Sequence, residues 1–200
     1  MANRHDLVTA ARAGDGDAFM DLVHLETPEA FRLTLAILRH PSDAEDALQD
    51  AFVRAWRELP GLRDLERWPA WFRRITVNAA IDTSRRKKSF HIVPLGFHEP
   101  PPMADSSAGL ADRDEVARAM GRLDSKDRAL LALRFGHDLE LPDVAAALGI
   151  PLGTAKSRLH RALGRMRKEM ESIDELEGHR EPASGEAECR VEPAPAEPGI

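Results

Sequence analysis

A stretch rich in proline and glycine, residues 89–112, divides the chain into two blocks whose apolar residues follow a helical spacing. No helical period continues through the stretch, and a structureless loop of that length is unusual inside one compact domain. Its prolines are Pro94, Pro100, Pro101 and Pro102. We therefore expect an all-α fold with two small helical domains, residues 15–88 and 113–171, joined by a flexible linker.

The C-terminal residues 172–200 are dominated by Glu, Pro, Ala and Gly, and we expect this acidic tail to be disordered because it has little apolar surface to bury. From Glu171 onward there are nine acidic and two basic residues, a net charge of −7, while the whole chain carries −6. Residues 71–90 and 153–170 each carry +5. Such local basic patches indicate where a polyanion binds, and we hypothesise that the tail shields them.

The chain has no apolar run of about 18 residues that could cross a membrane. Its first ten residues lack the apolar core of a secretory signal, so we expect a cytoplasmic protein. The single cysteine, Cys189, rules out an internal disulfide, and we interpret it as an exposed thiol without a redox or metal role.

The second block contains a pattern typical of a helix-turn-helix, from Leu141 to Met166. A short helix with Val144, Ala145 and Leu148 facing inward is followed by Gly149, which suits the left-handed backbone of a tight turn. We expect one apolar stripe on the next helix, formed by Leu152, Ala155, Leu159, Ala162, Leu163 and Met166. The opposite face carries Lys156, Ser157, His160 and Arg161. In this motif the N-terminal half of the second helix faces base edges, with Thr154 and Arg158 better placed for phosphates.

Residues 148–162, LGIPLGTAKSRLHRA, resemble the helix that reads the promoter −35 element in the extracytoplasmic-function (ECF) group of sigma-70 family sigma factors. Glu140 and Pro142 depart from the family pattern, but both lie on the supporting helix. The resemblance implies a sigma factor without catalytic activity or cofactor. Its implied partners are promoter DNA, core RNA polymerase through the β′ clamp helices and the β flap, and an anti-sigma factor.

The first block contains an amphipathic helix that we expect to start at Ser42, where Ser42 and Glu45 have the spacing of a capping box. Its apolar stripe comprises Ala44, Leu48, Ala51, Phe52, Ala55 and Leu59, and Pro60-Gly61 should end it. Upstream, Pro28 should break the helical pattern in two. The resemblance implies that this helix docks on the polymerase clamp, with contacts from Asp43, Asp46, Leu48, Gln49, Asp50, Phe52 and Arg54.

Residues 68–82, WPAWFRRITVNAAID, resemble the family's −10 recognition helix, which the basic run 85–88 completes. Capture of an unstacked base requires a basic track for the backbone and a pocket for the base. The resemblance places Asn78 and the loop 62–67 at the base pocket. It implies −10 contacts from Arg73, Arg74, Asn78, Arg85, Arg86, Lys87 and Lys88. We expect Trp71 and Phe72 to be core residues.

Two other functions remain open at this point. A stand-alone helix-turn-helix regulator, binding an operator as a dimer, would explain the second block but leave the first unexplained. A metal-dependent hydrolase would need acids from the first block to converge on a pocket, which one helix face does not readily provide. Its candidate ligands are Asp43, Glu45, Asp46 and Asp50.

Overall fold

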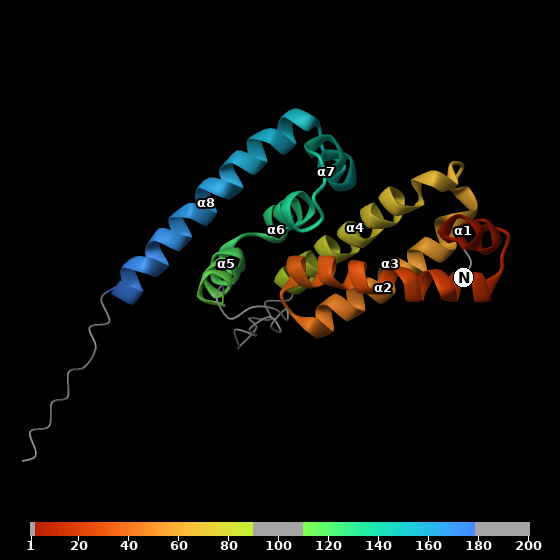
Figure 1. The fold of residues 1–200 in the computed structure, drawn as a ribbon, viewed down its shortest axis with the longest axis horizontal. Coiled ribbons are helices and arrows are strands. Elements are labelled where there is room, and N and C mark those ends of the chain that lie inside the picture. Colours follow the sequence, from red (N-terminus) through yellow and green to blue (C-terminus); the bar gives the residue numbers. More distant parts are fainter. Residues whose placement is uncertain (1–2, 90–109, 179–200) are drawn as a thin grey trace, which may run out of the picture.

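The protein is all helical in the two segments that the computed structural model describes, residues 3–89 and 110–178. The N-terminal half contains α1 (Arg4–Arg12), α2 (Gly16–Leu38), α3 (Pro41–Glu58), the short 3-10 turns η1 (Leu59–Gly61) and η2 (Leu65–Arg67), and α4 (Trp68–Ser89). The C-terminal half contains α5 (Leu110–Arg122), α6 (Ser125–Leu131), the π-helical turn η3 (Ala132–Gly136), α7 (Leu141–Leu148) and α8 (Leu152–Gly178) (Figure 1).

The N-terminal half is a bundle of α2, α3 and α4, with α1 packed on α2. Trp68 is fully buried at its centre, stacked on Phe72 with a centroid separation of 5.3 Å. The indole Nε1 of Trp68 donates a hydrogen bond of 3.1 Å to Glu26, whose buried carboxylate also pairs with Arg4 at 2.8 Å. These two partners compensate for the burial of the Glu26 charge.

Three local predictions for this half are wrong. The helix α2 continues through Pro28, because the apolar residues on both sides of the proline are buried and hold the two segments in one line. The helix α3 begins at Pro41, since proline suits the first helical position, so Ser42 is not the N-cap and the capping box does not form. Residues before Asp15 also form a helix, α1, which buries Leu7, Val8 and Ala11.

The C-terminal half differs from the expected boundaries at both ends. Helix α5 begins at Leu110, within the stretch expected to be a linker, and α8 stays helical to Gly178, beyond the expected start of disorder at residue 172. The rest of the predicted linker and acidic tail, including Cys189, lies outside the described residues. No helix in the part of the chain that the structure describes is long and apolar enough to span a membrane.

The two halves pack against each other through a shared apolar cluster. Leu33 and Ile37 of α2 and Val77 of α4 are buried in the same cluster as Leu130 of α6 and Leu133 of η3. In addition, α7 contacts α4 directly, so the helix-turn-helix is seated on the N-terminal half (Figure 1).

Two arginines cap backbone carbonyls at this junction. Arg128 donates hydrogen bonds of 2.5 Å to the carbonyl oxygens of Ile37, in the last turn of α2, and of Leu123, which follows α5. Arg39 donates to the carbonyl oxygen of Ala117 in α5. Burial lowers the pKa of both guanidinium groups, and the pKa of Arg128 falls to about 10 because the Arg39 charge adds to the effect of burial. Both arginines remain cations near neutral pH.

Replacing Arg128 with alanine should loosen the contact between the halves. The loss of two charge-assisted hydrogen bonds at a part-buried site is expected to cost about 1–3 kcal/mol. Small-angle X-ray scattering of the Arg128→Ala variant should then give a larger radius of gyration than that of the wild type. Arg12→Ala is the matched control, because Arg12 bonds the Leu62 carbonyl within the N-terminal half. Equal radii for the two variants would contradict this role of Arg128.

Candidate nucleic-acid interface

The turn between α7 and α8 is fixed by backbone geometry. Gly149 has a φ of +65°, in the left-handed region that side chains disfavour. The Ile150 amide donates to the Ala145 carbonyl oxygen at 3.0 Å, and the Gly149 amide donates to that of Ala146 at 3.2 Å. This pair of bonds is a Schellman motif, which satisfies carbonyls that the end of α7 would leave unpaired. The predicted left-handed glycine is confirmed.

The buried side of α8 is narrower than the sequence pattern indicated. Ala155 and Ala162 are fully buried, and Leu159 and Met166 pack partly against the shared cluster. Leu152 and Leu163, expected in the same stripe, are instead 39% and 40% exposed. The covered strip of α8 is therefore formed by these small and partly buried residues and excludes Leu152 and Leu163.

The N-terminal half of α8 presents polar side chains to solvent. Lys156, Ser157, His160 and Arg161 are exposed, whereas Thr154 and Arg158 are half-buried beside them. The Ser157 hydroxyl donates to the Thr154 carbonyl oxygen at 3.1 Å, and the Arg161 Nε donates to the Ser157 carbonyl oxygen at 3.3 Å. These weak local bonds to backbone leave the polar ends of both side chains accessible.

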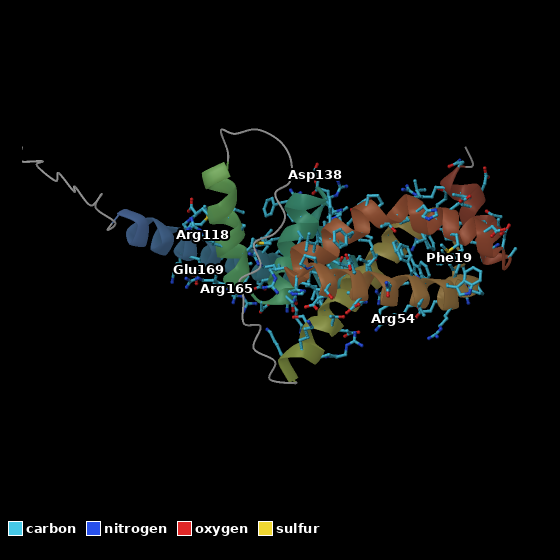
Figure 2. The ribbon with its side chains drawn as sticks, turned by 90° about the horizontal axis from the view of Figure 1, so that it is seen from below. Phe19, Arg54, Arg118, Asp138, Arg165 and Glu169 are labelled. Carbon is cyan, nitrogen blue, oxygen red and sulfur yellow. The ribbon has the colours of Figure 1, made fainter. Side chains whose placement is uncertain are left out.

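Further along, α8 is held to the helices beneath it by ion pairs. Arg165 pairs with the buried Asp127 of α6, and Glu169 pairs at 3.2 Å with Arg122 of α5 (Figure 2). These pairs, together with the buried Ala155 and Ala162, fix the position of the helix that carries the exposed basic turns.

A second polar face lies on α4. Arg74, Asn78, Arg85 and Lys88 are exposed, and their spacing places them along one side of the helix. Arg73, predicted to act with them, lies elsewhere: it is half-buried, with its Nη2 atom 3.8 Å from Glu29. The same carboxylate is 3.1 Å from His137 of η3, so Arg73 sits next to the C-terminal half.

Helix α3 carries the third set of predicted residues. Asp46 and Gln49 are exposed, Asp50 and Arg54 are half-buried, and Asp43 is almost fully buried. Two further members, Leu48 and Phe52, lie beneath this surface: Leu48 belongs to the core, and Phe52 stacks on Phe72 with centroids 4.9 Å apart.

Two carboxylates of α3 face basic side chains. Asp43 and Asp50 pair with Lys87 and Arg86 of α4. No group of three or more potential metal ligands comes together among the described residues. This charge pairing gives no support to the hydrolase interpretation.

The sequence interpretation missed the residues that join the halves, above all Glu29, Arg39 and Arg128. Their partners in the opposite half lie more than 75 positions away in the chain, so no local spacing signals them. The acidic residues of α3 and the basic residues of α4 are evident in the sequence, but which of them pair depends on how the two helices pack.

This fold, with its two exposed basic helices, defines a DNA-binding protein built from two helical parts. Comparison with known families assigns these parts: residues 22–90 match Sigma-70 region 2, and residues 119–168 match Sigma-70 region 4. The chain is 33% identical to the RNA polymerase sigma-E factor of Streptomyces antibioticus over 156 residues, 78% of this chain and 86% of the relative. It is 35% identical to the ECF RNA polymerase sigma factor SigM of Mycobacterium tuberculosis over 161 residues, 80% and 81% of the two chains.

Solved structures share the fold. CnrH, solved in complex with the cytosolic domain of CnrY, matches with a TM-score of 0.60 and 25% identity, over 84% of this chain and 97% of that one. RpoE of Bartonella quintana, solved in complex with the anti-sigma factor NepR, matches with a TM-score of 0.60 and 23% identity, over 76% and 96%. The chain belongs to the ECF group of the sigma-70 family, whose members direct RNA polymerase to promoters.

The turn geometry predicts opposite effects for two glycine substitutions. Gly149→Ala forces a Cβ into the left-handed region and should destabilise the protein by about 1 kcal/mol. Gly164→Ala, inside α8 where an added Cβ would meet no atom within 4 Å, should stabilise it by up to about 1 kcal/mol. Urea unfolding of both variants checks the pair. A Gly149→Ala protein as stable as Gly164→Ala would show that the left-handed turn is not required.

Proposed function

We propose that the exposed N-terminal half of α8 reads the −35 element of promoter DNA. The observation that carries this proposal is the cluster of exposed polar side chains on a helix that α5, α6 and α7 hold in place. Lys156 and Arg161 are suited to guanine O6 and N7, and Ser157 and His160 can donate or accept at base edges. Thr154 and Arg158, which flank this surface, are suited to phosphates that orient the helix without specifying sequence.

We further propose that α4 contacts the −10 element once its strands separate. The exposed line of Arg74, Asn78, Arg85 and Lys88 offers cations to a single-stranded backbone and an amide to a base. Asn78, with the loop 62–67, would accept the flipped base. Arg73 could join only by leaving Glu29, which belongs to the same half of the protein.

The polymerase-binding surface is assigned to α3. Asp46 and Gln49 are exposed, and the half-buried Asp50 and Arg54 flank them. Leu48 and Phe52 would support this surface from below. A mixed-charge helix face suits docking on the β′ clamp helices, where charge sets the register. The C-terminal half would contact the β flap.

On this proposal, residues 15–88 and 113–171 act as two DNA-binding domains whose spacing polymerase fixes, and this spacing supplies avidity. The chain would work in the cytoplasm, without catalysis or a cofactor. We also propose a protein inhibitor of the anti-sigma kind, supported by the solved relative RpoE, which was co-crystallised with the anti-sigma factor NepR.

Run-off transcription with purified core RNA polymerase on a library of genomic promoters tests the function. The chain should produce promoter-specific transcripts, and Lys156→Ala combined with Arg161→Ala should lower their yield at least tenfold at limiting protein, since each base contact is worth about 1–3 kcal/mol. Arg167→Ala is the matched control: it removes an exposed cation from the same helix but outside the proposed reading half.

Two results would overturn the proposal. Equal transcription by the double variant and the control would remove α8 as the reading helix. An absence of transcripts, together with tight binding of duplex DNA by the chain alone, would favour a dimeric stand-alone regulator.

A further inference from the structure

Three ion pairs join the proposed polymerase-binding surface of α3 to the proposed DNA-binding end of α4. Asp50 pairs with Arg86 at 3.0 Å, Arg54 pairs with Asp82 at 3.3 Å, and Asp43 pairs with Lys87. Each pair has its α3 member in the set assigned to polymerase. The position of Arg54 on α3 can be followed in Figure 2.

The pairs extend to further groups on α4. Asp82, held by Arg54, also binds Arg85 at 3.2 Å. Arg86 donates a second hydrogen bond, 3.0 Å long, to the Thr83 hydroxyl. Arg86 is therefore held by a carboxylate of α3. Arg85 is held by Asp82 of α4, whose carboxylate also pairs with Arg54 of α3.

The ion pairs differ in how readily their members can exchange one charged partner for another. Asp43 is 7% exposed and close to His40 as well, so its pair with Lys87 is a fixed anchor between the helices. The side chains of Asp50 and Arg86 are 46% and 57% exposed, so water and ions reach both. Exposed pairs of this kind are weak and can give way to a stronger charge nearby.

We propose that Asp50 of α3 withholds Arg86 from DNA in the chain without polymerase, and that docking of a cationic polymerase surface on α3 releases it. The inference rests on the proposed function and assigns Asp50 as a positioning residue for the −10 contacts.

Competition between the Asp50 carboxylate and a DNA phosphate for Arg86 changes the DNA affinity in a defined direction. A DNA phosphate that binds Arg86 must first displace the Asp50 carboxylate, so the pair lowers DNA affinity of the chain alone. A polymerase cation that binds Asp50 removes this cost. By linkage, bound DNA must raise the affinity for polymerase by the same factor.

The test measures binding of a fluorescein-labelled single-stranded oligonucleotide of mixed sequence to the full chain, by anisotropy at low salt. Asp50→Asn should bind about threefold more tightly than Glu45→Gln, which removes an equal charge from another exposed face of α3. Thermal unfolding first establishes that both variants fold. Equal affinities would overturn the inference, because they would show only a general charge effect.

A double-mutant cycle isolates the pair. In an Arg86→Gln background, Asp50→Asn should bind no more tightly than Glu45→Gln, since the cation to be released is gone. A threefold difference that persists in this background would place the effect outside the Asp50–Arg86 pair and overturn the assignment.

The same probe with preformed holoenzyme tests release by polymerase. The advantage of Asp50→Asn over Glu45→Gln should disappear, because polymerase already occupies the carboxylate of the control protein. An advantage that remains threefold would overturn the release step. Failure of the proposed function is recognised separately, by a wild-type chain that does not bind core polymerase at all.

Discussion

The apolar cluster shared by the two halves is the contact on which the rest of the arrangement depends. Ile37 and Val77 from one half and Leu133 from the other are fully buried in it. Because α7 rests on α4 and is joined to α8 by a rigid Schellman turn, the direction of α8 follows from the same contact. Arg39 and Arg128 add direction to an otherwise non-directional interaction, since their donors fit only particular carbonyls.

Electrostatics in this protein is local. The chain is acidic overall, yet its exposed helix faces on α4 and α8 are basic, and Asp43 and Asp50 of α3 pair with cations of α4. A net charge therefore says little about what the molecule binds. Ion pairs hold some cations at the α3–α4 junction. Other cations, such as Lys156 on α8, are exposed to solvent.

The sequence predicted what short-range periodicity and turn chemistry determine: the all-helical class, the buried stripe of α3 and the left-handed Gly149. It failed where tertiary packing outweighs a local preference. Pro28 does not break α2, because burial on both sides compensates for one missing hydrogen bond. The exposure of Leu163, the position of Arg73 beside Glu29 and the capping by Arg128 depend on contacts between distant segments, which a helical pattern does not encode.

The length of α8 places its last residue, Gly178, far from its exposed basic turns. The helix runs from Leu152 to Gly178, and at 1.5 Å per residue Gly178 lies about 33 Å from Lys156. That distance is close to one full turn of duplex DNA. The helix thus acts as a spacer, which places Gly178 roughly one DNA turn away from the end of α8 that would face the bases.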